Sequence, residues 1–284
     1  MKNLFKRLPL FRIIVTSILL AFSGSVILII AADAAYISKS SILEVLLSPD
    51  IRAAFILTLW TSLITTGFCL VIGVFSAYGL SRYPFKGSDV LDVIVDLLII
   101  LPVLVIGVSL LVLFRIGADL SGSPNVLVSW FGKVMTHLGD FFIYNRSGIV
   151  LAQFFCSISF AIRTIKAAFD HIDPRTEQVA MTLGCTRAGA FRRITLPLAK
   201  QGIMAGAVLS WARSFGLFGP VAIVAGAVRQ KTEVLSTSIY LEISIGRLET
   251  ALAVSLVMIA ASFITLLLLR IFFGGNIFGS GGSR

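Results

Sequence analysis

The side chains of this sequence that could do acid–base or metal chemistry are few and far apart. His137 and His171 have no metal-ligand spacing between them. Cys69, Cys156 and Cys185 form no CxxC pair. The sequence also lacks the Gly-x-Ser-x-Gly, His-Glu-x-x-His and GxxxxGK[ST] motifs. We therefore expect no enzyme activity, no metal, no cofactor and no ATP binding in this chain.

One charged residue stands out, because Arg213 lies inside an otherwise apolar run. A charge at that depth of a membrane costs at least about 2.5–3.5 kcal/mol, so we expect Arg213 to face the bundle interior or a water-filled path. There it would lower the barrier for a passing anion. The alternative is a packing role, with Arg213 paired to an interior group such as Asp96. The residues beside it permit a break in the helix and complete a predicted gate: Gly216, Leu217, Phe218, Gly219 and Pro220.

A second group of charges lies on one helical face, where Asp89, Asp92 and Asp96 recur at i, i+3 and i+7. Such spacing puts the three carboxylates side by side. We expect them to form ion pairs with the basic segment at 173–197 rather than to act as an acid–base pair.

The elements that must position these residues are long apolar helices. The 284 residues are 57% hydrophobic and 13% charged, whereas soluble domains carry about 25% charged residues. The apolar runs also exceed the roughly 20 residues that span a bilayer. The sequence therefore predicts an all-α, polytopic helical membrane protein. About six spans are expected, at 11–32, 53–80, 92–114, 147–169, 201–227 and 249–273.

The net charge of +10 reflects basic residues at the ends of these spans, so we expect no nucleic-acid partner. With a cytoplasmic N-terminus, the cytoplasmic segments hold about twice as many Lys and Arg as the outer ones. This bias predicts a multi-pass protein of the plasma (inner) membrane with both termini in the cytoplasm. The first run exceeds a signal-peptide core, so a retained anchor is favoured over a cleaved signal. We expect residues 1–50 to form this helix and an outer loop, and residues 276–284 to form a flexible Gly/Ser tail.

The predicted outer loop between Arg115 and Arg146 carries an apolar stripe at helical spacing. It fits a helix lying in the membrane interface, and a helix capping the bundle from outside fits equally well. The stripe consists of Val126, Leu127, Trp130, Phe131, Val134, Met135, Leu138, Phe141 and Phe142.

Residues 173–197 are a polar, basic segment that predicts a helix–turn–helix. Asp173 can cap a helix that begins at Pro174, and Glu177 in its first turns suits the helix dipole. Gly184 can end this helix in the left-handed conformation, and Thr186 can cap the next. Two plainer interpretations stay open: a solvated loop, or a basic patch for anionic lipid headgroups.

These residues resemble the "EAA" loop in the membrane subunits of binding-protein-dependent ABC importers. The pattern is Glu177-x-x-Ala180-x-x-x-Gly184, then nine residues, then Ile194-x-Leu196-Pro197, with Gln178 where the family usually has Ala. The resemblance implies a type I importer (MetI-like) permease fold with its core at 51–275. It implies that residues 170–197 are coupling helices seated in a groove of an ATPase subunit. The implied coupling residues are Glu177, Ala180, Leu183, Gly184, Cys185, Arg187, Phe191, Ile194, Leu196 and Pro197.

Four further stretches resemble the molybdate/tungstate/sulfate branch of this family: 99–107, 163–175, 213–220 and 231–240. Leu217 and Pro220 depart from the branch, which usually has Glu and Ala there. The resemblance implies a homodimer that moves a small oxyanion, with two ATPase subunits and an extracytoplasmic solute-binding protein. A permease for another small solute stays open as an alternative, as does a stand-alone secondary transporter.

Overall fold

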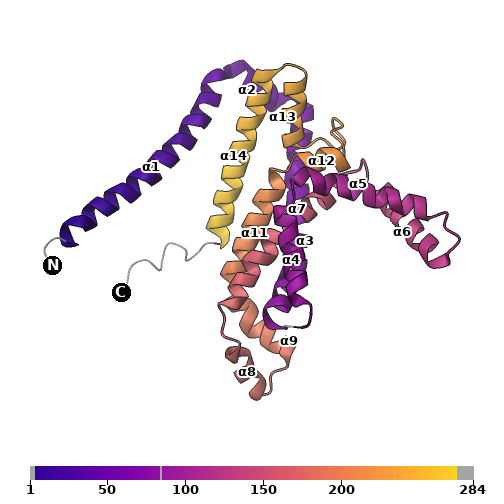
Figure 1. The fold of residues 1–284 in the computed structure, drawn as a ribbon. Helices are drawn as coiled ribbons and strands as arrows, with labels where there is room; N and C mark the ends of the chain where they lie inside the picture. The colour runs from indigo at the N-terminus through magenta and orange to yellow at the C-terminus, as the bar shows by residue number, and fades with distance from the viewer. Residues whose placement is uncertain (1–3, 84, 274–284) are drawn as a thin grey trace.

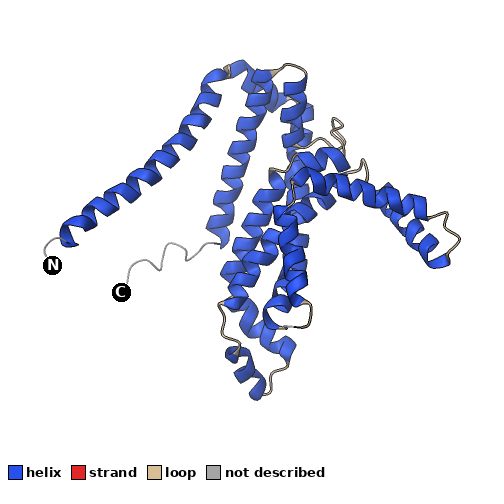
Figure 2. Cartoon of the chain, in the orientation of Figure 1, coloured by secondary structure: helices blue, strands red, loops and turns tan. Residues whose placement is uncertain are grey.

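The computed structural model describes residues 4–83 and 85–273, and every regular element within them is helical (Figure 2). Long helices run side by side, and short helices lie at both ends (Figure 1). One end carries α2 (Lys39–Leu47) and α13 (Leu235–Ser244). The other carries α8 (Arg175–Thr182) and α9 (Arg187–Ala190). We call these the α13 end and the α8 end. The predicted tail at 276–284 lies outside the described residues.

Five helices within the described residues are long and apolar enough to cross a membrane. Four coincide with predicted spans and the fifth with part of one. They are Leu10–Tyr36 within α1 (Leu4–Tyr36), α3 (Pro49–Arg82), α5 (Val103–Leu120), α7 (Arg146–Asp170) and Leu248–Leu268 within α14 (Leu248–Phe273).

The spans predicted at 92–114 and 201–227 each consist of two helices, and the second is interrupted where Gly216, Gly219 and Pro220 were expected to permit a break. The first is divided into α4 (Ser88–Ile100) and α5, because Pro102 lacks the N–H that would continue the helix. The second is divided at 216–218 into α11 (Lys200–Phe215) and α12 (Gly219–Val224). With 16 residues, α11 alone is too short to count among the five.

Small residues let α7 and α11 pack closely. A Cβ built on Gly202 would lie 2.1 Å from the Ala168 Cβ, and one built on Gly206 would lie 2.9 Å from Ile165 Cγ1. Such small-residue contacts are typical of helices that associate within a membrane. They fix α11, and with it Arg213, against α7.

A buried polar network ties α3, α7 and α11 together. Gln153 is 1% exposed. Its Oε1 accepts from Thr65 at 3.0 Å, and its Nε2 donates to the Ser214 carbonyl at 3.1 Å. The hydroxyls of Ser157 and Ser214 are 2.9 Å apart. These groups are hydrogen-bonded to one another, so the free-energy cost of burying them is small. The bonds also fix the rotation of each helix about its own axis.

Two parts project from the bundle on opposite sides, namely α1 and the hairpin of α5 with α6 (Val126–Phe142) (Figure 1). The predicted apolar stripe at 126–142 is a helix, which confirms that expectation. Its first turns do not cap the bundle, since Val126, Leu127 and Trp130 are 81%, 78% and 65% exposed. The hairpin is held where Gly117 meets Met135.

Candidate coupling and translocation sites

The helix–turn–helix predicted at 173–197 is confirmed. Asp173 Oδ1 accepts from the Arg175 amide at 2.9 Å at the start of α8. Gly184 has φ 90°, which is the left-handed conformation predicted for it. Thr186 Oγ1 accepts from the Gly189 amide at 3.1 Å and caps α9. The chain continues through the π-helix η1 (Phe191–Thr195) and α10 (Leu196–Leu198) into α11.

Glu177 points inward and joins three elements. It is 8% exposed. Its carboxylate accepts from Tyr78 Oη at 2.8 Å, Arg82 Nε at 3.0 Å and Thr195 Oγ1 at 2.7 Å. Tyr78 and Arg82 lie on α3, and Thr195 lies in η1. We call these four residues the Glu177 clamp, because they fasten both halves of the helix–turn–helix to the end of α3.

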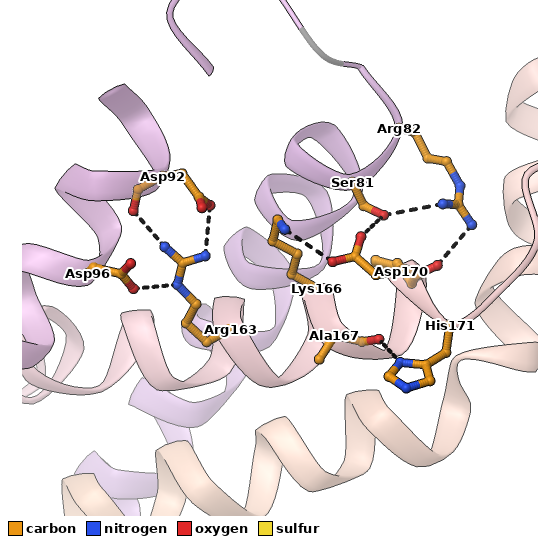
Figure 3. A network of polar contacts seen from close by, with 10 residues as sticks. Ser81, Arg82, Asp92, Asp96, Arg163, Lys166, Ala167, Asp170 and His171 are labelled. Carbon is orange, nitrogen blue, oxygen red and sulfur yellow. Dashed lines mark hydrogen bonds and ion pairs between the residues drawn. The ribbon is translucent and has the colours of Figure 1, made fainter. Parts of the chain in front are cut away.

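Arg82 extends the clamp to α7. Its Nη2 donates to the carbonyls of Phe169 at 2.9 Å and Ile172 at 2.7 Å. Beside it, Asp170 accepts from Ser81 at 2.5 Å and from Lys166 at 3.1 Å (Figure 3). Sequence reasoning missed Arg82 as a site residue and used it only for topology. No local pattern pointed to this role, because the burial of Glu177, which calls for a cationic partner, is evident only from the structure.

The charge of Glu177 is stabilised in place. Burial by itself raises the pKa of this carboxyl, but the hydrogen bonds from Thr195, Tyr78 and Arg82, with the Arg82 charge, lower its pKa below the usual value. Glu177 is therefore a carboxylate at neutral pH. A charge-assisted bond to Arg82 is stronger than a neutral one, so α8 is held firmly.

The small apolar face predicted for α8 is divided in two. Ala180 is buried toward the bundle, whereas Val179 and Leu183 are 58% and 83% exposed one turn apart. A cavity of about 420 Å³ lies beside the clamp and is lined by residues of α8 and of the end of α3. The Arg187 guanidinium, at its wall, lies 6.0 Å from the centroid of the Tyr83 ring.

The remaining predicted coupling residues lie along the same segment. The Phe191 ring centroid lies 4.5 Å from that of Tyr78. Cys185, Ile194 and Leu196 are half-buried, and Pro197 is exposed.

Arg213 does not pair with Asp96, so the packing partner considered for it is wrong. Asp96 instead accepts from Arg163 Nε at 2.5 Å, and Asp92 accepts from Arg163 Nη1 at 2.8 Å (Figure 3). The aspartates therefore pair with α7 rather than with the basic segment at 173–197. Arg213 is exposed on the surface of the single chain, with its guanidinium 5.3 Å from the Phe160 ring centroid.

The break between α11 and α12 is firmly packed. The buried Leu217 accepts at its carbonyl from Ser236 Oγ at 2.8 Å, and the Phe218 ring lies 5.0 Å from that of Tyr240. After them, Gly219 and Pro220 press on α5. A Cβ on Gly107 would lie 2.8 Å from Pro220 Cα, so α12 packs closely against α5 at this glycine. Gly216 has no such contact within 3.8 Å and provides the turn.

These features define an integral membrane protein of the transport class. It has membrane-spanning helices, a broken helix that carries an exposed cation, and a rigid helical pair clamped to one end. Residues 69–274 match the family described as "Binding-protein-dependent transport system inner membrane component", and the chain belongs to that family. It is thus a multi-pass inner membrane permease subunit of an ABC importer and is not itself an enzyme.

Curated relatives cover most of the chain. The sulfate transport system permease protein CysT of Salmonella typhimurium is 33% identical over 223 residues, which are 78% of this chain and 76% of that protein. The molybdenum transport system permease protein ModB of Escherichia coli is 32% identical over 225 residues, which are 79% of this chain and 93% of that protein. A probable molybdenum ABC transporter permease protein of Haloferax volcanii is 34% identical over 229 residues, 79% and 78% of the two chains.

A solved structure shares the fold. A chain in the crystal structure of a bacterial alginate ABC transporter, in complex with an alginate pentasaccharide-bound periplasmic protein, superposes with a TM-score of 0.70. The likeness covers 95% of this chain and 96% of that one at 19% identity. It therefore supports the fold alone.

Proposed function

We propose that this permease subunit imports a small oxyanion, namely molybdate, tungstate or sulfate, driven by ATP hydrolysis in a separate subunit. It would work as a homodimer with two ATPase subunits at the α8 end and an extracytoplasmic solute-binding protein at the α13 end. Both termini would then lie in the cytoplasm. Support comes from the basic residues near the α8 end and from sulfate and molybdenum permeases among the relatives.

The Glu177 clamp is the observation that carries the coupling role. It attaches α8 to α3 through Arg82 and to η1 through Thr195, while Val179 and Leu183 remain exposed. A helix that is held on one side and exposes two apolar side chains on the other suits a groove of a partner protein. Movement of the ATPase subunits would then shift the ends of α3 and α7 instead of bending a loop.

Arg213 carries the oxyanion part of the proposal. A cation exposed on a single chain at membrane depth needs water or a second subunit beside it. In a homodimer, two such residues beside the 216–218 breaks would provide a weakly attractive positive path for an anion. Closing and opening of the ATPase pair would expose this path alternately to the two sides.

Reconstitution with the neighbouring ATPase and binding protein tests the whole proposal. We expect ATP-driven uptake of radiolabelled sulfate or molybdate into proteoliposomes, and none without the ATPase. Uptake by the permease alone would instead favour a stand-alone secondary transporter. Failure of every oxyanion, with another solute transported, would refute only the substrate.

The docking surface has a matched pair of variants. Leu183→Asp should abolish co-purification of the ATPase, because a charge would enter an apolar contact. Gln178→Asp, exposed on the same helix but pointing away from both Val179 and Leu183 at helical spacing, should retain the ATPase. Normal coupling in Leu183→Asp would contradict the docking role.

A further inference from the structure

A groove between α3 and α7 contains two cavities with different linings. The cavity nearer the α13 end has a volume of about 360 Å³, and the second has a volume of about 410 Å³. Their α3 residues form one stripe at four-residue spacing, so the cavities follow one another along the same helix face. The first is lined by Ile56, Trp60, Arg146, Gln230 and Glu233. The second is lined by Ile64, Phe68, Ile72, Phe142, Val150 and Phe154, among others.

Glu233 gives the first cavity an unpaired carboxylate. It is 2% exposed, and neither of its oxygens accepts a well-formed hydrogen bond from the described residues. The nearby cation is already used, since Arg229 donates to Glu242 at 2.6 Å and to Asp50 at 3.4 Å. Burial raises the pKa of Glu233, and this outweighs the lowering by the nearby Ser238 hydroxyl and the Arg229 charge. The Ser238 hydroxyl itself donates to the Val234 carbonyl. A buried carboxylate that accepts no well-formed hydrogen bond is costly, so the site fits a ligand that carries N–H donors and positive charge.

Arg146 gives the same cavity a donor for an anion. Its Nε donates to the Lys231 carbonyl at 3.0 Å, and its Nη2 donates to the Gln230 carbonyl at 3.3 Å. These bonds fix the guanidinium and leave Nη1 for a further acceptor. Guanidinium is well suited to phosphate. One cavity therefore offers an acceptor for an ammonium and a donor for a phosphate, which together match a zwitterion.

The dimensions of the groove suit a lipid. The stripe from Trp60 to Ile72 is about 18 Å long at 1.5 Å per residue, close to the roughly 15 Å of hydrocarbon in one leaflet. Trp60 is 64% exposed at the polar end, where tryptophan is enriched at membrane interfaces. The aliphatic and aromatic side chains beyond it can cover one acyl chain.

We infer that this groove binds one phospholipid with a primary ammonium headgroup, a phosphatidylethanolamine. Its ammonium would contact Glu233, its phosphate would contact Arg146, and one acyl chain would fill the apolar cavity. The site requires only that the helices span a membrane, while its assignment to the outer leaflet rests on the proposed orientation. The helix α1 of a second copy of the chain fits this groove less well than a lipid. Near its α13 end that helix carries Asp33, a carboxylate, where Glu233 calls for a positively charged group.

Lipid retention on the purified transporter tests this site. Native mass spectrometry would follow the protein from nanodiscs with equal amounts of dioleoyl phosphatidylethanolamine, its N-methyl and N,N-dimethyl forms, and phosphatidylcholine. Each methyl group removes one N–H donor and leaves the charge. We expect about tenfold or greater preference for the primary amine over the trimethylated lipid, decreasing along the series.

Variants assign the preference to the groove. Glu233→Gln should reduce it to within about twofold, because the charge-assisted bonds are lost. Glu44→Gln makes the same charge change on the exposed surface of α2 and should keep it. Val150→Trp should reduce retention of all four lipids by filling the apolar cavity.

Three results would overturn the site. One is equal retention of all four lipids by the unaltered protein, which needs no variant to fold. Another is a preference that survives Glu233→Gln. The third is loss of the dimer in Glu233→Gln with lipid retention unchanged, which would assign the groove to a second copy. Each differs from failure of the proposed function, since oxyanion uptake is not the readout.

Discussion

Arg82 Nε lies 3.0 Å from Glu177 Oε1, and both side chains are almost fully buried. The pair connects the last turn of α3 to the first turn of α8. Arg82 also binds the carbonyls at the end of α7, so three helices meet at one guanidinium. The family resemblance implied that Glu177 contacts an ATPase, but in this structure its carboxylate is used inside the chain. The exposed large apolar side chains of this segment are Val179 and Leu183.

Removing one partner of this pair should be destabilising. Arg82→Ala leaves a buried carboxylate without its cation, which costs about 3–5 kcal/mol in comparable pairs. We expect a clear fall in the thermal unfolding midpoint in detergent. In a double-mutant cycle with Glu177→Gln the two losses should be strongly non-additive. Additive losses would show that the two side chains do not interact energetically.

The clamp should also make stability depend on pH. The pKa of Glu177 is lower in the folded protein than its usual value of 4.5. Its stabilisation is therefore complete above pH 4.5 and is lost as the pH falls through the folded pKa. We expect the difference in unfolding midpoint between the unaltered protein and Glu177→Gln to be constant near neutrality and to shrink in acid. A difference that grows below pH 4.5 would contradict this sign.

Gly184→Ala should weaken coupling through the backbone. Gly184 has φ 90°, and a Cβ there would meet no atom within 4 Å, so the cost is conformational strain of about 1–2 kcal/mol. We expect inserted protein with reduced ATP-driven uptake, measured against ATP hydrolysis. Gly122 is the matched control, because it also has open space but lacks the positive φ. Full coupling in Gly184→Ala would mean that the turn carries no force, and the more disruptive Gly184→Pro should uncouple further.

Arg213→Ala should leave assembly intact and reduce uptake. The guanidinium is exposed and lies over the Phe160 ring. At exposed sites such a cation–π contact contributes only about 0.5–1 kcal/mol to stability. Dimer content by size-exclusion chromatography should therefore be unchanged while oxyanion uptake falls. Arg213→Lys, which keeps the charge, should recover part of it. A variant that fails to assemble would restore the packing role.

The sequence alone determined the features that depend on neighbouring residues. Long apolar runs required membrane helices, Gly184 and Thr186 set the turn between α8 and α9, and the spacing from Glu177 to Pro197 indicated the family. Each signal lies within a few positions, where backbone preference and capping decide the outcome.

Only the tertiary structure decided which charges meet. Glu177 met Arg82, and Asp96 met Arg163 rather than Arg213 or the basic segment. It also turned Ala180 inward while leaving Leu183 exposed. These outcomes depend on how each helix is rotated about its axis and on which helix lies beside it. That choice is made by contacts such as Gly202 against Ala168, between residues far apart in the chain, and no local pattern contains it.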